Sequence, residues 1–386
     1  MRRTRTAVDS NRIDSLGAWR GRLTIARFIS RHVAVGIVGL VAIGLVSVES
    51  SGGRTLGQTL RPVESGVTAS LRGVSVVDSR IVWASGAEGT VLRSLDGGRN
   101  WERRPVAGHD RTDFRDIQAF DAERAVILAA GAPPVILLTD DGGATWSERF
   151  RHPDPEAFLD AFAFDARGRG IALADPIEER FELLETTDAG RTWHRWDAER
   201  KPAAGSGEHA YAASGSIVAL DDDGTIRLGL GGPNPESSDA SCRVLRLGRD
   251  ETMWRTEPVP MPGGESAGIF SIVRIDERRA VVVGGDYRLP DRAEGTAAWT
   301  DDGGDVWQVP EQGLGGYRSA VAVRRSGEAI ELIATGPTGT DRSRDGGKSW
   351  HPLSELGYHA FAFAPDGSLG IAVGSEGRIA RLTDHD

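Results

Sequence analysis

The chain has 386 residues, with 46 Lys and Arg against 56 Asp and Glu, which gives a formal net charge of −10 at pH 7. An acidic chain is a poor partner for nucleic acid, because nucleic-acid binding depends on basic surfaces. Cys242 is the only cysteine, so the sequence excludes an intramolecular disulfide and any thiolate-based zinc or iron–sulfur site. With 39% hydrophobic and 26% charged residues, the composition is that of a globular protein.

The N-terminus reads as a separate segment. Residues 1–32 carry eight arginines against two aspartates, and the uncharged run 33–48 (VAVGIVGLVAIGLVSV) follows directly, with residues 49–58 as a polar linker. A basic, then apolar, then polar order is typical of secretory signals, and the basic flank predicts a cytoplasmic N-terminus. Three interpretations remain open: an uncleaved signal anchor, which we favour, a cleaved signal peptide, and a buried core element. On the first two, the rest of the chain is periplasmic or extracellular, either membrane-anchored or secreted.

One octet recurs five times after this segment, with the pattern [S/T]-x-D-x-G-x-x-W. The copies are SLDGGRNW (94–101), TDDGGATW (139–146), TTDAGRTW (186–193), TDDGGDVW (300–307) and SRDGGKSW (343–350). Trp254 divides the longest interval and marks a degenerate sixth copy, and a seventh, unfinished unit ends the chain at 358–382. Each unit also contains short β-branched runs bounded by Gly, Asp or Pro, which are typical of strands. About four strands per unit, repeated seven times, predict an all-β, seven-bladed propeller of four-stranded antiparallel blades over residues 59–386.

The octet residues have a structural interpretation. Gly suits the positive-φ positions of a hairpin between the third and fourth strands, Asp can accept turn N–H bonds, and Trp can pack on the neighbouring blade. Five equivalent copies on five blades cannot converge on one metal or catalytic site. We therefore assign a structural role to Asp96, Trp101, Asp141, Trp146, Asp188, Trp193, Asp302, Trp307, Asp345 and Trp350.

The last unit has only three strands, so its blade needs a fourth strand from elsewhere in the chain. The stretch TLRPVESGVTAS (59–70), ahead of the first unit, is the one candidate. We expect this stretch to join the two ends of the propeller and to remove its exposed sheet edges.

These octets identify the chain as similar to Asp-box (BNR) repeat propellers, the superfamily that includes sialidases. The stretch LRGVSVVDSRIVWASGAEGTVLRSLDGGRNW (71–101) more specifically resembles the opening blade of photosystem II stability/assembly factors and their bacterial relatives. The resemblance covers roughly residues 60–386. It implies an exported propeller that helps to assemble a membrane complex.

Propeller topology predicts where a site would lie. The innermost strand of each blade starts, and its second strand ends, on the face opposite to the Asp-box hairpins, so polar residues at these places should surround one mouth of the central channel. All four tyrosines of the chain fall beside these places, and tyrosine is favoured where ligands or partners dock. The predicted ligand- or partner-binding residues are Arg72, Arg115, Asp116, Asp160, Asp175, Ser271, Asp286, Tyr287, Arg318 and His359.

Three interpretations of this mouth stay open. The polar groups can line the channel and bond to one another, bind a protein partner or an anionic or glycan ligand, or act in catalysis. We favour a non-enzymatic, membrane-associated, monomeric protein that binds a protein partner or membrane complex. The alternative is a glycoside hydrolase of the sialidase-like type, in which Asp160 and Asp286 would act on a sugar and three arginines would bind a carboxylate. No dinucleotide-binding motif, metal-ligand spacing or other cofactor signature occurs, so we expect no cofactor and no metal.

Overall fold

The computed structural model describes residues 58–131, 133–233, 241–327 and 329–384. The predicted signal or anchor at residues 1–48 lies outside the described residues. Within the described ranges, no helix is both long enough and apolar enough to span a membrane. Regular structure there consists of strands and a single 3-10 helix, η3 (Ser375–Gly377).

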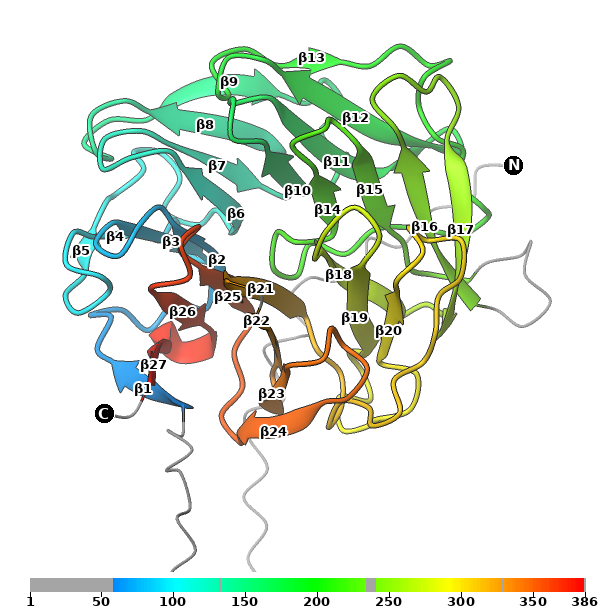
Figure 1. The fold of residues 1–386 in the computed structure, drawn as a ribbon. Helices are drawn as coiled ribbons and strands as arrows, with labels where there is room; N and C mark the ends of the chain where they lie inside the picture. Colours follow the sequence, from blue (N-terminus) through cyan, green and yellow to red (C-terminus); the bar gives the residue numbers. More distant parts are fainter. Residues whose placement is uncertain (1–57, 132, 234–240, 328, 385–386) are drawn as a thin grey trace, which may run out of the picture. The chain divides into compact units, whose positions relative to one another are not determined.

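Seven antiparallel sheets form the blades of a propeller, which confirms the predicted fold (Figure 1). From the innermost strand outward, the first three blades are β2 (Leu71–Val76), β3 (Val82–Gly86), β4 (Val91–Ser94) and β5 (Glu102–Arg103); β6 (Phe114–Ala119), β7 (Ala125–Ala129), β8 (Val135–Thr139) and β9 (Ser147–Arg151); and β10 (Leu159–Phe164), β11 (Gly170–Ile177), β12 (Arg180–Thr186) and β13 (His194–Arg195). The fourth and fifth blades are β14 (Val218–Leu220), β15 (Ile226–Gly229), β16 (Ser241–Leu247) and β17 (Arg255–Pro262); and β18 (Ala267–Arg274), β19 (Ala280–Asp286) and β20 (Ala297–Thr300). The last two are β21 (Ala320–Ser326), β22 (Ala329–Gly336), β23 (Gly339–Ser343) and β24 (His351–Ser354); and β25 (Ala360–Phe363), β26 (Gly370–Val373), β27 (Ile379–Asp384) and β1 (Gln58–Val63).

The fifth blade departs from the predicted four strands. Its sheet has three strands, and beyond β20 it carries only an isolated bridge between Trp299 and Gln308. After Gln308, the described residues form no further ladder pair with β20.

The two ends of the propeller are joined in the seventh blade. Strand β1 pairs antiparallel with β27 in a continuous register from Gln58↔Asp384 to Val63↔Ile379. The blue strand β1 lies beside the red strand β27 in Figure 1. The 59–70 stretch therefore contributes the missing strand, as its sequence position predicted, and no sheet edge is left open between the chain ends.

Each Asp-box hairpin is fixed by the same hydrogen bonds. In the second blade, Thr139 Oγ1 donates to Asp141 Oδ1 (2.8 Å) and accepts the N–H of Gly143 (2.9 Å). Asp141 Oδ1 also accepts the N–H of Thr145 (2.8 Å), and its Oδ2 accepts the Thr145 hydroxyl (2.6 Å). In the other four boxes, the N–H of the fifth residue likewise bonds to the first side chain and that of the seventh to the aspartate.

The hairpins also pack each blade against the one before it. Trp193 of the third blade packs in a cluster with Val126 and Leu138 of the second. The glycine at the fifth position of the box contacts the same neighbour: a Cβ added to Gly190, whose φ is +81°, would lie 2.6 Å from Val126 Cγ2. Glycine is thus required at this position for two reasons: the turn has a positive φ, and the neighbouring blade leaves no room for a side chain.

The Asp-box carboxylates should govern acid stability. Hydrogen bonds from Thr145 and Thr139 lower the pKa of Asp141 to about 2, below its ordinary value of 3.8. Because the folded-state pKa is the lower one, the stabilisation is present above about pH 4 and is lost as the pH falls toward about 2. We expect Asp141→Asn to lower the melting temperature at pH 7 and to flatten its decline below pH 4, measured by thermal unfolding across this range. Asp250→Asn, in the hairpin between β16 and β17, is the control, and parallel pH curves for Asp141→Asn and wild type would contradict the prediction.

Candidate functional site at the channel mouth

The strand directions define two faces of the propeller. The innermost strands (β2, β6, β10, β14, β18, β21 and β25) all begin at one edge, which we call the mouth face, and the antiparallel order returns each second strand to that edge. The hairpin between the third and fourth strands of a blade must then lie at the opposite edge. The Asp boxes and the predicted site residues therefore occupy opposite faces of the molecule.

A β-bulge occurs near the start of the innermost strand in four blades. The ladder between the first and second strands skips Arg72, Arg115, Asp160 and Phe270. A bulge redirects the side chain it carries. An alignment of F-R-D (114–116) with F-L-D (158–160) would make Asp160 equivalent to Asp116. In the structure, Asp160 instead occupies the bulge position, which Arg115 occupies in the previous blade.

Arg115 is buried and bonded within the protein. Its Nε donates to Asp113 Oδ2 (2.6 Å), and its Nη1 donates to the carbonyl oxygen of Ala212 (3.0 Å). Asp113 was not among the predicted site residues, although its position two residues before Arg115 is compatible with such a pair. Arg115 thus connects the second blade with the segment leading into the fourth.

Two predicted site residues link neighbouring innermost strands. Asp116 Oδ2 accepts the N–H of Phe162 on β10 (2.9 Å), and Ser271 Oγ accepts the N–H of Val321 on β21 (2.9 Å). Burial raises the pKa of Asp116 to about 8, although the N–H bonds from Phe162 and Ile117 oppose this shift. Both side chains are almost inaccessible to solvent. We therefore interpret Asp116 and Ser271 as residues that link neighbouring blades.

Asp160 is fully buried, and neither of its carboxylate oxygens has a hydrogen-bond partner among the described residues. Burial, followed by the nearby charge of Asp175, raises its pKa well above the ordinary value, while Arg115 acts in the opposite direction. Asp175 is half-buried at the end of β11, where its Oδ1 accepts the N–H of Ala210 (3.2 Å). The structure therefore brings together Arg115, Asp160 and Asp175, all three of which were predicted site residues.

Arg318 and His359 are also buried at the mouth face. Arg318 forms an ion pair with Asp341, with Nε and Nη2 each 2.6 Å from Oδ2. Burial and the charges of Arg72, Arg115 and Arg378 lower the pKa of His359 well below its ordinary value, so its ring is neutral near pH 7. Arg72 is itself 4% exposed, so this part of the mouth is filled with side chains.

An aromatic cluster lies beside this network, and one of its members, Tyr317, directly precedes Arg318 in the chain. Tyr211 stacks on Phe270 with ring centroids 3.8 Å apart, and Tyr287 and Tyr317 pack edge-on against Phe270 at 6.3 and 4.7 Å. Three of the four tyrosines thus meet, whereas Tyr358 packs in a separate cluster with Phe361. Phe270 holds the group together, and the sequence interpretation missed it because an apolar residue in a strand carries no site signal.

Asp286 and Tyr287 lie where the aromatic cluster reaches solvent. Asp286 Oδ1 accepts the Ser266 hydroxyl (2.7 Å) and the N–H of Arg288 (2.9 Å). Tyr287 is half-buried, and the Arg288 guanidinium lies over its ring, 5.8 Å from the centroid. Together with Tyr211, these residues form the accessible part of the candidate site.

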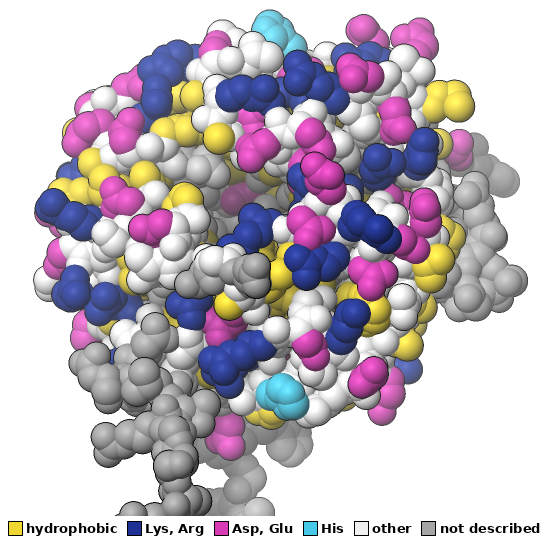
Figure 2. Space-filling model, in the orientation of Figure 1, with side chains coloured by type: hydrophobic (Ala, Val, Ile, Leu, Met, Phe, Trp, Pro, Cys, Tyr) yellow, Lys and Arg dark blue, Asp and Glu magenta, His cyan; other side chains and the backbone are white. Residues whose placement is uncertain are grey.

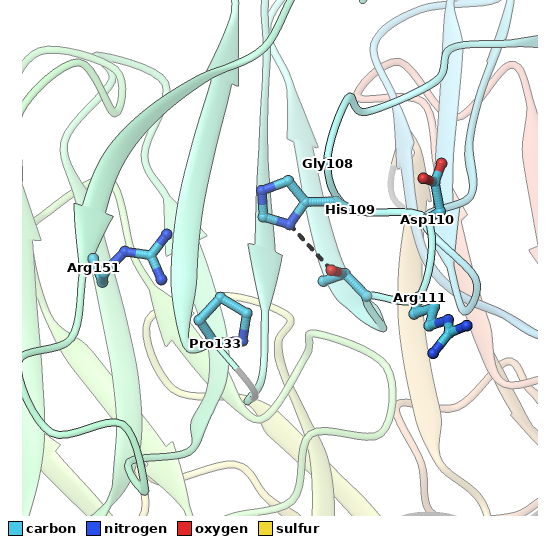
Figure 3. Close-up of a pocket in the computed structure, with 7 residues that line it drawn as sticks. Gly108, His109, Asp110, Arg111, Pro133 and Arg151 are labelled. Carbon is cyan, nitrogen blue, oxygen red and sulfur yellow. Dashed lines mark hydrogen bonds between the residues drawn. The ribbon is translucent and has the colours of Figure 1, made fainter.

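Among the described residues, no group of three or more His, Cys, Asp or Glu side chains is arranged to hold a metal ion. Basic and acidic side chains are interspersed over the view in Figure 2. One cavity on the mouth face lies apart from the predicted residues, at the edge of the second blade (Figure 3).

The buried carboxyl group of Asp160 should cost stability at neutral and higher pH. Its pKa is higher in the folded than in the unfolded state, so the wild-type protein loses stability as the pH rises from about 4 through the folded-state value. Asparagine has the same shape and no charge. We expect Asp160→Asn to be more stable than wild type by at least about 1 kcal/mol at pH 8, with a smaller gain at pH 5, because each raised pKa unit corresponds to about 1.4 kcal/mol. Urea unfolding at the two pH values measures the difference, and a gain that does not grow with pH would contradict the assignment.

Taken together, the fold and the mouth define an Asp-box β-propeller whose channel entrance is filled by a buried charged network beside an accessible aromatic cluster. Residues 55–151 match the family model described as Photosynthesis system II assembly factor YCF48. The resemblance to the photosystem II assembly-factor-like propellers, predicted from the sequence, is therefore confirmed. No curated protein matches the chain in sequence.

Solved structures with the same fold include two of YCF48. The structure titled "YCF48 bound to D1 peptide" has a TM-score of 0.58 and 20% sequence identity, and the match covers 84% of this chain and 97% of that one. YCF48 from Cyanidioschyzon merolae has a TM-score of 0.58 and 18% identity, covering 84% and 98%. The WD40 propeller domain of Doa1 matches with a TM-score of 0.54 and 12% identity, covering 85% and 97%. At these identities the likeness shows the propeller fold alone.

Proposed function

We propose that this chain is a non-enzymatic binding protein that acts outside the cytoplasm and assists the assembly of a membrane complex, with its mouth face as the docking surface for a protein partner. The family match over residues 55–151 supports the assembly role. The related YCF48 structure is described as bound to a D1 peptide, which supports a protein or peptide as the kind of partner.

The observation that carries the proposal is the contrast between the fully buried carboxyl group of Asp160 and the accessible tyrosines beside Asp286. A glycoside hydrolase needs two carboxyl groups that reach the scissile bond. Asp160 is fully buried, and Asp286 is bonded to Ser266 and Arg288. The half-buried tyrosines Tyr211 and Tyr287 are suited instead to contact with another protein. The burial of Asp160 argues against the hydrolase alternative, because a buried carboxyl group cannot reach a sugar.

The location rests on the N-terminal sequence. A basic segment followed by a 16-residue apolar run and a polar linker supports export with retention in the membrane. This part of the proposal is tested by fractionation of the host cells and by protease accessibility of the propeller in intact spheroplasts. Digestion of the propeller only after the cytoplasmic membrane is lysed would overturn it.

The docking proposal is tested by capturing the partner from solubilised host membranes with the full chain. We expect Tyr287→Ala combined with Arg288→Ala to reduce recovery of the co-purifying complex by tenfold or more, since aromatic and arginine residues dominate binding interfaces. Arg288 is exposed and Tyr287 half-buried, so the fold should survive the change.

Met253→Ala combined with Arg249→Ala is the matched control, because both residues are exposed in the hairpin between β16 and β17 on the opposite face. Loss of recovery in the control and not in the Tyr287/Arg288 variant would overturn the proposed surface.

A further inference from the structure

The strand that closes the ring also determines where the N-terminal segment joins the propeller. Strand β27 is the third strand of its blade, so it runs from the mouth edge to the Asp-box edge, and β1 pairs with it antiparallel. Strand β1 therefore begins at the Asp-box edge with Gln58 and reaches the mouth edge at Val63. Only residues 49–57 separate Gln58 from the apolar run 33–48, and so short a chain spans at most about 30 Å.

Three arginines lie at the seam between the seventh and first blades, beside this entry point. Arg61 and Arg381 are directly opposite each other in the β1–β27 ladder, so their side chains lie on the same side of the sheet. Arg99 belongs to the Asp-box hairpin of the first blade. A Cβ added to Gly98 in that hairpin would lie 3.8 Å from Arg381 Cγ, so the hairpin and β27 are in contact. We call Arg61, Arg99 and Arg381 the seam arginines.

The seam arginines carry an excess of positive charge. In the part of the chain that the structure describes, none of the three has an ion pair, and Arg381 Nε has no hydrogen-bond partner. Burial and the charge of Arg99 lower the pKa of Arg381, while the carboxylate of Asp96 opposes this shift. Three arginines and one aspartate leave two positive charges, although the chain as a whole carries a net charge of −10.

More arginines lie on the other side of β1, where the sixth blade meets the seventh. Glu331 accepts Arg324 Nη2 at 2.5 Å, and the Nε atoms of Arg344 and Arg342 lie 3.4 and 4.0 Å from its other oxygen. One carboxylate cannot neutralise all three guanidinium groups. Arg342 Nη1 also donates to Gln58 Oε1 (3.4 Å), so this group touches the first residue of β1.

An anionic lipid surface fits these features. Arg61 and Arg99 are exposed, so they can meet a flat surface, and no enclosed ion site is needed to use their charge. Leu95, in the same hairpin as Arg99, is an exposed apolar side chain that such a surface can also contact. Two arginines directly opposite in a ladder repel each other, and lipid phosphates would relieve that repulsion.

We propose that the Asp-box edge of the first and seventh blades rests on the anionic surface of the membrane, with the seam arginines bound to lipid phosphates. This inference rests on the membrane retention in the proposed function and adds an orientation to it. The mouth face is directed away from the bilayer, so the partner reaches it with a segment that extends beyond the lipid headgroups.

The test places the full chain in nanodiscs of phosphatidylcholine, with or without phosphatidylglycerol, and compares two fluorescent labels on the first blade. Ser79→Cys carries the label at the Asp-box edge, and Ala107→Cys carries it at the mouth edge, where both positions are exposed. Cys242 is buried and stays unlabelled. With phosphatidylglycerol present, we expect spin-labelled headgroups to quench the label at position 79 at least about twofold more strongly, because each arginine near an anionic leaflet strengthens the attraction about fivefold.

The variant Arg61→Gln, Arg99→Gln, Arg381→Gln should lose this difference between the labels. The matched control is Arg249→Gln, Arg255→Gln, Arg278→Gln, which makes the same changes at exposed positions on the Asp-box edge of the fourth and fifth blades and should keep it.

Equal quenching of the two labels in the otherwise wild-type chain, or a difference that persists in the seam variant, would rule out the orientation. The proposed function fails on other results, namely unchanged partner recovery by the Tyr287/Arg288 variant or absence of the chain from the membrane fraction. The two failures are therefore distinguishable.

Discussion

Replacing Arg318 by alanine should destabilise the protein by about 3–5 kcal/mol, because breaking a buried ion pair leaves the remaining charge without a partner. The Arg318 and Asp341 side chains are each 3% exposed, and two guanidinium nitrogens lie 2.6 Å from the same carboxylate oxygen. Arg318 Nη1 also donates to the carbonyl oxygen of Tyr317 (3.0 Å). Urea unfolding of the full chain at pH 7 measures the loss.

The exposed Arg288→Ala is the matched control and should change stability by less than about 1 kcal/mol, since its pair with Glu265 lies at the surface. The double variant Arg318→Met, Asp341→Leu removes both charges and should recover most of the loss. A change below about 1 kcal/mol for Arg318→Ala would mean that this arginine is a replaceable surface group. Arg318 would then again be a candidate for partner contact.

A disulfide across the closure of the ring should raise stability strongly. Thr59 and Thr383 face each other in the β1–β27 ladder and are 324 residues apart in the chain. Cross-linking so long a loop corresponds to about 6 kcal/mol in the chain-entropy description, with native-state strain reducing that figure. We expect Thr59→Cys combined with Thr383→Cys to oxidise readily and to raise the melting temperature by several degrees, an increase that reductant abolishes.

The single-cysteine variants are the controls for this experiment. Cys242 is buried and should not compete for the bond. Two free thiols at positions 59 and 383 after oxidation would contradict the closure that the structure describes.

The sequence predicted the fold almost completely, because a propeller repeats its signals. Five copies of one octet, with Gly190 and its equivalents at positive φ, identify the hairpin of each blade, and the short last unit requires the strand at 59–70. The three-stranded fifth blade was not predicted. Its octet ending at Trp307 is complete, so the repeat pattern gives no sign that the strand after it is missing.

The candidate site was predicted less well, since burial and partners are properties of the assembled ring. Strand order places the starts of the innermost strands at one face, but no local pattern indicates that Asp116 bonds to Phe162 on the next blade. The position of the bulge at Asp160 likewise depends on how β10 pairs with β11, which the sequence of β10 alone does not determine.

Hydrogen–deuterium exchange of the full chain, free and bound to its captured partner, tests the central claim that one face of the ring is the docking surface. We expect protection on binding at 108–115, 209–214 and 284–290, and unchanged exchange in the Asp-box hairpins at 94–101 and 343–350. Protection confined to those hairpins, with free exchange along the first three segments, would contradict it.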